Sequence, residues 1–210
     1  MANITCLVII FFCSWTQVWA QDERTFREML VPKSFRAEEP AKVHYKTRSK
    51  NYFIDINGDL LQENIFFANR DGQTYFYIED TYGKKVFEQK LVGVGPAQWP
   101  YRLSFRWLSP RSSAILIHFF EGRVDYLRSR GTSRLDVVTI DNKDLNTLSY
   151  KSGPIIWDEQ NDKREHYHQR PYEVSVLDLD GDGMRDILVK YHLISRVMLY
   201  RGKGRWTTTN

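Results

Sequence analysis

The chain of 210 residues has only two cysteines, Cys6 and Cys13, and both lie within its first 20 residues. If that segment is removed after export, the remaining chain has no thiol, which excludes both a disulfide and a cysteine nucleophile. A domain without disulfides must be held together by its apolar core, by a bound metal ion, or by both.

Charged side chains are missing from the first 20 residues. The apolar stretch at 7–13, followed by the small residue Ala20, is typical of a secretory signal peptide cleaved before Gln21. This stretch is too short to span a bilayer, and a later one at 114–122 is short and interrupted by His118. We therefore expect a soluble protein that is secreted, periplasmic or at the cell surface, with no membrane span.

Several catalytic signatures are also missing. No serine lies in a G-x-S-x-G context, and no glycine-rich phosphate-binding loop precedes a helix. His166 and His168 would share a face of an extended strand, but the sequence places no third metal ligand near them. The sequence does not support an enzyme, and it leaves a secreted hydrolase or lyase acting on an anionic polymer as the alternative.

From Asn51 onward the sequence is a series of short β-rich runs, such as TYFYIED and LDVVTID, separated by turn residues. Long helical periodicity is absent. Many short strands with turn chemistry between them predict an antiparallel all-β fold. The predicted turns are NRDG at 69–72, YG at 82–83, SPRSS at 109–113, EG at 121–122, RG at 130–131 and SGP at 152–154.

Two regions repeat the same order of strand, acidic loop, apolar strand, polar turn and strand, one from Phe53 and one from Val176. Their loops begin at Asp55 and Asp178, too far apart for neighbouring repeats of about 40 to 50 residues. Residues 103–129 are a candidate for an intervening unit, whose loop LSPRSS has no carboxylate.

The acidic loop at 178–186, DLDGDGMRD, lies between two predicted strands. Carboxylates alternating with glycines let several oxygens converge on one point, which suits calcium because this ion takes six to eight oxygen ligands. An EF-hand is excluded, because Val189 stands where its bidentate glutamate belongs. The alternative is a solvated turn without an ion. The candidate ligands are the side chains of Asp178, Asp180, Asp182 and Asp186 and the backbone carbonyl of Met184.

The strand-embedded pattern D-x-[DN]-G-D-G-x-x-D resembles the calcium loops of FG-GAP and VCBS repeats, the units of integrin-alpha-like β-propellers. The resemblance covers the regions around 51–80 and 172–202. It implies a propeller-like array of about three to four antiparallel blades, with calcium loops between blade strands. Because closed propellers usually have four to eight blades, the array would be an incomplete propeller capped by an N-terminal arm, or copies would associate.

The first loop, DINGDLLQE at 55–63, departs from this pattern. Leu60 replaces the second glycine, and a left-handed conformation there would cost about 1 to 2 kcal/mol. The last ligand is ambiguous, because Glu63 stands at position 9 but an alignment of the following strands brings Asn64 there. We expect a second, weaker calcium site, with a vestigial metal-free loop as the alternative. Its ligands would be Asp55, Asn57, Asp59 and Glu63.

The net charge of +4 and the basic clusters at 45–50, 128–134 and 201–205 are compatible with anionic partners, although most such charges form a solvated surface. Nucleic acid is not expected as a partner of an exported protein. Core packing is expected for Trp99, Trp107, Trp157 and Trp206, rather than the sugar stacking that is their alternative role.

The sequence thus predicts a signal peptide at 1–20, an N-terminal arm at 21–50 and an FG-GAP/VCBS-like domain at 51–210. The predicted function is that of an exported calcium-binding module that binds a protein or glycan, with calcium in a structural role and with self-association as one way to cover exposed strands.

Overall fold

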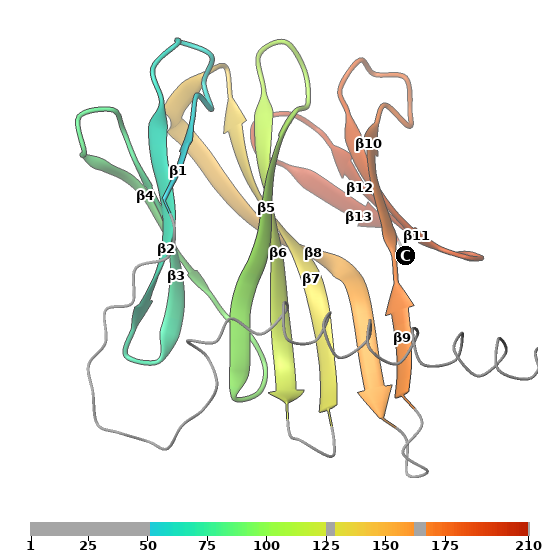
Figure 1. The fold of residues 1–210 in the computed structure, drawn as a ribbon. Helices are drawn as coiled ribbons and strands as arrows, with labels where there is room; N and C mark the ends of the chain where they lie inside the picture. Colours follow the sequence, from blue (N-terminus) through green and yellow to red (C-terminus); the bar gives the residue numbers. More distant parts are fainter. Residues whose placement is uncertain (1–50, 125–128, 162–166, 210) are drawn as a thin grey trace, which may run out of the picture. The chain divides into compact units, whose positions relative to one another are not determined.

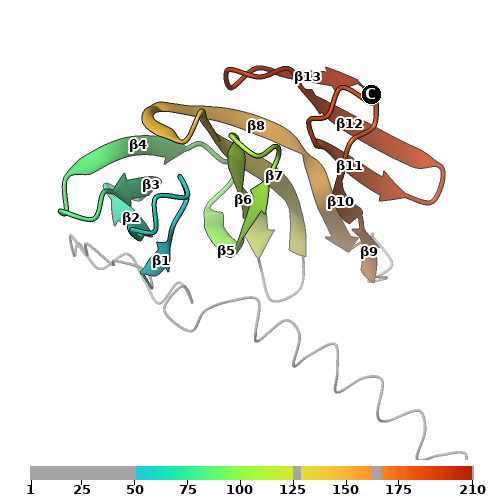
Figure 2. The same cartoon turned by 90° about the horizontal axis from the view of Figure 1, so that it is seen from above.

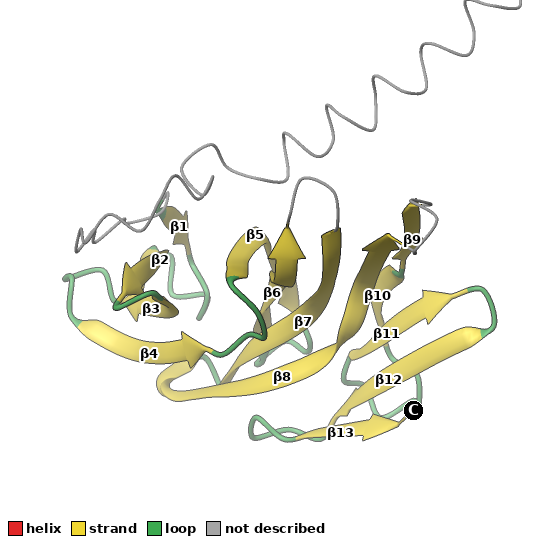
Figure 3. Ribbon diagram, turned by 90° about the horizontal axis from the view of Figure 1, so that it is seen from below, coloured by secondary structure: helices red, strands yellow, loops and turns green. Residues whose placement is uncertain are grey.

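The computed structural model describes residues 51–124, 129–161 and 167–209 (Figure 1). These residues belong to one compact unit at 44–210. Every regular element in the described part is a strand (Figure 3), and no helix there is long and apolar enough to cross a membrane. The predicted signal peptide at 1–20, the predicted arm at 21–50, His166 and the side chain of His168 lie outside the described residues.

The described strands form three antiparallel sheets in which neighbours pair in chain order (Figures 1 and 2). Sheet A contains β1 (Tyr52–Ile54), β2 (Glu63–Arg70), β3 (Gln73–Glu79) and β4 (Lys85–Leu91). Sheet B, which curls into a half-barrel, contains β5 (Ala97–Trp107), β6 (Ser113–Val124), β7 (Ser129–Asp141), β8 (Asp144–Asn161) and β9 (Tyr167–Pro171). Sheet C contains β10 (Glu173–Leu177), β11 (Asp186–Tyr191), β12 (Ile194–Tyr200) and β13 (Trp206–Thr209). The predicted antiparallel all-β fold is confirmed.

Sheet B lies between sheets A and C (Figure 2), and β6 is buried on both faces. Successive side chains of a strand point to opposite faces, so alternate residues of β6 pack against different sheets. The first core joins Ile65, Phe67, Phe76, Ile78 and Leu91 of sheet A to Ile115, Ile117, Phe119, Val138 and Ile140 of sheet B. The second joins Ala114, Leu116, Leu135 and Val137 of sheet B to Ile187, Val189, Met198, Tyr200 and Trp206 of sheet C. This double burial explains why AILIHFF is an almost unbroken apolar run.

Three predicted turns are correct and three are wrong. The turns at 69–72, 82–83 and 109–113 connect strands as expected, whereas EG at 121–122, RG at 130–131 and SGP at 152–154 lie inside strands. Gly122 pairs directly with Gly131, and a Cβ on Gly131 would lie 2.3 Å from the Phe120 ring. A Cβ on Gly153 would lie 2.2 Å from the Leu135 carbonyl oxygen. These glycines therefore serve the close approach of neighbouring groups and do not reverse the chain.

Candidate functional site

The two acidic loops occupy equivalent places in sheets A and C. The loop at 55–63 connects β1 to β2, and the loop at 178–186 connects β10 to β11. Ile54 pairs with Glu63 at the base of the first loop, as Leu177 pairs with Asp186 at the base of the second. Glu63 is therefore the counterpart of Asp186, whereas the side chain of Asn64 donates a hydrogen bond to Glu79.

The first carboxylate of each loop holds the backbone through the same hydrogen bonds. Asp55 accepts from the N–H groups of Gly58 at 2.6 Å and Leu60 at 2.9 Å. Asp178 accepts from those of Gly181 at 2.7 Å and Gly183 at 3.0 Å. The four donor residues have positive φ angles of 75°, 69°, 77° and 83° in that order. Leu60 thus adopts the left-handed conformation that the pattern reserves for glycine.

The last carboxylate of each loop is buried and ties the loop to its base. Glu63 accepts from the N–H of Ile56 at 2.9 Å, and Asp186 accepts from the N–H of Leu179 at 3.0 Å. Asp186 also accepts from the N–H of Tyr200 at 2.8 Å, which joins β11 to β12. Burial raises the pKa of Glu63 above its ordinary value. Both residues act as structural anchors within their sheets.

The middle positions of the two loops also correspond. The side chains of Asn57 and Asp180 accept from the N–H two residues later, at 3.1 and 3.4 Å. Those of Asp59 and Asp182 accept from Leu61 and Met184, both at 2.8 Å. The Met184 side chain packs against the core between sheets B and C.

The second loop brings three of its acids together. Asp178, Asp180 and Asp186 each present an oxygen within 4.8 Å of the others. Asp182 does not belong to this group, and no such group of acids forms at 55–63 among the residues that the structure describes. The donors are hard carboxylate oxygens, and an oxygen that accepts one N–H still has a lone pair for a cation, so the chemistry fits calcium.

Arg201, which follows β12, supplies the second loop with a positive charge. Its guanidinium donates to Asp180 and lies 3.6 Å from the Asp182 carboxylate. The hydrogen bond from Arg201 lowers the pKa of Asp180. The outer carboxylates therefore have a protein cation as a direct partner, whereas the hydrogen bonds that Asp178 and Asp186 accept from described residues come from backbone N–H groups.

The loop between β5 and β6, at 108–112, lies between the two acidic loops. The Arg185 N–H donates to the Leu108 carbonyl at 2.8 Å, and the Ser113 hydroxyl donates to the Ile56 carbonyl at 2.7 Å. This loop has no acid of its own, but the Ser112 hydroxyl donates to the buried Asp141 carboxylate at 2.8 Å. The three loops thus form one connected end of the described domain.

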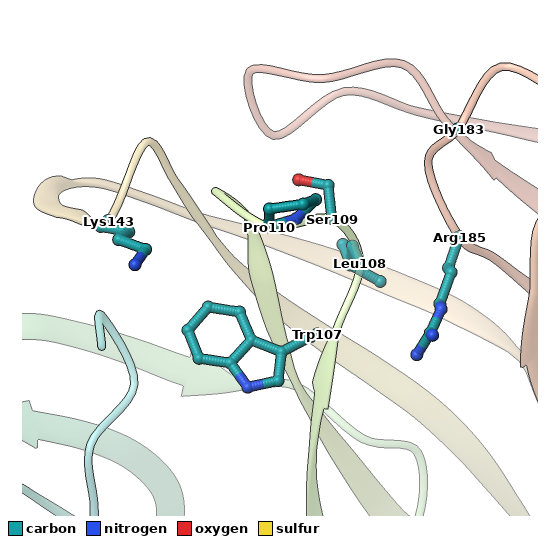
Figure 4. Close-up of a pocket in the computed structure, with 7 residues that line it drawn as sticks. All are labelled: Trp107, Leu108, Ser109, Pro110, Lys143, Gly183 and Arg185. Carbon is teal, nitrogen blue, oxygen red and sulfur yellow. The ribbon is translucent and has the colours of Figure 1, made fainter.

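A cavity of about 480 Å³ opens at this end (Figure 4). It is lined by Trp107, Leu108, Ser109, Pro110, Lys143, Gly183 and Arg185. Neither a carboxylate nor a histidine lines it among the described residues, so it holds no acid–base pair there. The residues come from three separate segments, and sequence reasoning missed their convergence because only the sheet stacking brings them together.

The tryptophans divide into two groups. Trp99 and Trp206 are buried, and Trp99 stacks on Phe120 with ring centroids 4.3 Å apart. Trp157 is half-buried beside the same phenylalanine. Trp107 is 37% exposed and faces the cavity. Core packing is therefore confirmed for Trp99 and Trp206, only partly met by the half-buried Trp157, and wrong for Trp107.

The chain matches none of the protein-family models, curated proteins or solved structures with which it was compared. The resemblance to FG-GAP and VCBS repeats therefore rests on the loop pattern.

Proposed function

We propose that this protein is a calcium-stabilised β-module of the FG-GAP/VCBS type, with its three sheets as propeller-like blades. Its role would be to bind a protein or glycan outside the cytoplasm, with calcium in a structural role. The observation that carries the proposal is the common geometry of the loops at 55–63 and 178–186. Two loops with different sequences follow the same hydrogen-bonded backbone path around their first carboxylate, one of them despite a left-handed leucine.

The anchoring of the second loop supports a structural role for calcium. Asp186 lies in β11 and hydrogen-bonds to β12, while Asp178 belongs to the segment that follows β10. An ion shared by Asp178, Asp180 and Asp186 would link three strands of sheet C and neutralise the repulsion among the acids. The loop at 55–63 would bind calcium more weakly, because Asn57 replaces one carboxylate.

Thermal unfolding in millimolar calcium and in chelator tests this proposal. Calcium that binds only the folded state at 100 times its Kd adds about 2.7 kcal/mol of stability. We expect Asp178→Asn, which removes a charge but keeps the side-chain shape, to abolish most of this increase. Asp71→Asn is the matched control, because Asp71 lies in an exposed turn and asparagine tolerates its φ of 54°. The proposal would be overturned if calcium did not raise the thermal stability of the unmodified protein, or if it raised the stability of both variants equally.

A further inference from the structure

The indole of Trp107 is held at the edge of the cavity. The residue ends β5, and its ring packs edge-on against Phe105 with centroids 5.3 Å apart. Gly58 of the first acidic loop lies behind it, and a Cβ there would come within 3.2 Å of the indole. A tryptophan that remains 37% exposed while its position is fixed offers a rigid apolar surface to a ligand.

Lys143 lies on one side of this indole (Figure 4). Its ammonium is 5.9 Å from the ring centroid, and the backbone is held in a left-handed turn with φ of 59°. The Lys143 N–H donates to the Arg111 carbonyl at 3.0 Å, which fixes the turn against the loop at 108–112. The backbone that carries this charge therefore has a defined position beside the indole.

Arg185 lies on the other side of Trp107 and comes from the second acidic loop (Figure 4). Its backbone is fixed by the hydrogen bond to Leu108 at 2.8 Å. Within the described part of the chain, no carboxylate forms an ion pair with Lys143 or Arg185. Two cations that line one cavity without an acidic partner favour an anionic ligand.

We propose that this cavity binds an acidic sugar unit of a glycan, with the apolar face of the sugar ring on Trp107 and its carboxylate or sulfate group held by Lys143 and Arg185. The guanidinium can bind such a group through two parallel hydrogen bonds, and the ammonium adds a point charge. The inference specifies the ligand class of the proposed binding function, but it does not depend on bound calcium.

A single-stranded nucleic acid is the competing ligand, because bases also stack on aromatic rings. Proteins that bind such strands use several aromatic side chains for successive bases along a basic groove. Here Trp107 is the one aromatic residue among the described residues that line the cavity. One aromatic ring beside two cations favours a single acidic ring over a strand of stacked bases.

Isothermal titration calorimetry of the full chain tests the inference with four probes. These are a galacturonic acid trimer, a sulfated trisaccharide, the neutral galactose trimer and a short oligothymidylate. We expect one or both acidic sugars to bind about tenfold or more tighter than the neutral trimer. The comparison of the two acidic probes distinguishes a carboxylate from a sulfate ligand.

Variants assign the binding to the cavity. Trp107→Ala should weaken it about tenfold or more, and Trp107→Phe should restore part of it. Lys143→Asn, which suits the left-handed turn, and Arg185→Gln should each weaken it about threefold to tenfold. Lys190→Gln removes the same charge from an exposed site on β11 and should change affinity by less than about twofold. Circular dichroism confirms that each variant is folded.

Three outcomes would overturn the inference: equal binding of the neutral and acidic sugars, loss of affinity in Lys190→Gln as large as in Arg185→Gln, or tighter Trp107-dependent binding of oligothymidylate. The titrations are repeated in calcium and in chelator beside the melting experiment. Trp107-dependent sugar binding without a calcium effect on melting would overturn the calcium role alone. A calcium effect on melting without sugar binding would overturn this inference alone.

Discussion

The loops at 55–63 and 178–186 follow the same backbone path with different residues at key positions. Both have an acid first, glycine fourth, aspartate fifth and an acid last, but the sixth residue is Leu60 in one and Gly183 in the other. The hydrogen bonds to Asp55 and Asp178 are nevertheless the same. The shared path therefore does not require glycine at position 6, and it goes with the features that the loops have in common, namely the acids at the two ends, the glycine at position 4 and the aspartate at position 5.

The loops differ more in charge than in path. The second loop gathers three acids within 4.8 Å and has Arg201 beside them, whereas no comparable group of acids forms in the first loop among the described residues. The shared path therefore does not by itself make two equal cation sites. The buried anchors and the exposed charges should therefore make separable contributions to stability and to cation binding.

The largest difference should appear when the last carboxylates are removed. Asp186→Ala leaves the N–H groups of Leu179 and Tyr200 without their acceptor, the latter in a fully buried site, and we expect a loss of about 3 to 5 kcal/mol in chelator. Glu63→Ala removes the acceptor of the Ile56 N–H and no hydrogen bond to a third strand, so about 1 to 3 kcal/mol should be lost. Urea unfolding of both variants measures the two losses. Equal losses would show that the second hydrogen bond of Asp186 contributes nothing.

Acid should destabilise the protein through His118 even when neither loop binds an ion. Burial lowers the pKa of His118 to about 4 from 6.5, so the unfolded state binds more protons than the folded state between these values. The stabilisation is complete above pH 6.5 and falls as the pH drops toward 4, by about 2 kcal/mol at pH 5 and about 3 kcal/mol in full.

Urea unfolding in chelator at pH 7 and pH 5 measures this loss, and His118→Gln should remove most of it. His118 lies within β6 and in neither acidic loop. Once the loss of stability that it causes is subtracted, the remaining loss at low pH can be attributed to the two loops and compared between them. An unchanged loss in His118→Gln would instead assign acid sensitivity to the carboxylates.

Giving each loop the sixth residue of the other should change the free energy of unfolding in opposite directions. Leu60→Gly relieves a left-handed leucine, and after the greater freedom of glycine in the unfolded chain is subtracted, a gain of about 0.5 to 1 kcal/mol remains. Gly183→Leu imposes the same strain, which the smaller freedom of leucine in the unfolded chain partly offsets, so a loss of about 0.5 to 1 kcal/mol should remain. Open space around Gly183 excludes a steric clash as a further cause. Chelator is present in both measurements of unfolding. A loss in Leu60→Gly would show that the exposed leucine has a packing role.

The sequence predicts the loops better than the sheets that hold them. The alternation of acids and glycines is a local signal, and it locates both loops and the candidate acids. The longest strand, β8, was missed because Gly153 and Pro154 look like a turn, whereas the glycine instead permits close approach to the Leu135 carbonyl. Trp107 and Lys143 belong to sheet B and Arg185 to the loop of sheet C, so these residues meet only because the two sheets pack together, and no local pattern contains that information. Arg201 belongs to a basic cluster that suggested a polyanion, but it pairs with the protein's own aspartates.

The smallest effect should come from removing the positive charge of Arg201, which lies beside the second loop. Arg201 donates to Asp180, so it competes with any cation for that carboxylate. Arg201→Gln should therefore tighten calcium binding by the second loop about twofold to fivefold, the range expected for an exposed ion pair, while lowering stability slightly in chelator. Calorimetric titration with calcium measures the change, and Arg205→Gln is the control because it removes the same charge from the same exposed turn. Equal affinities in the two variants would mean that Arg201 is an ordinary surface partner, and that the second loop differs from the first only in the number and spacing of its acids.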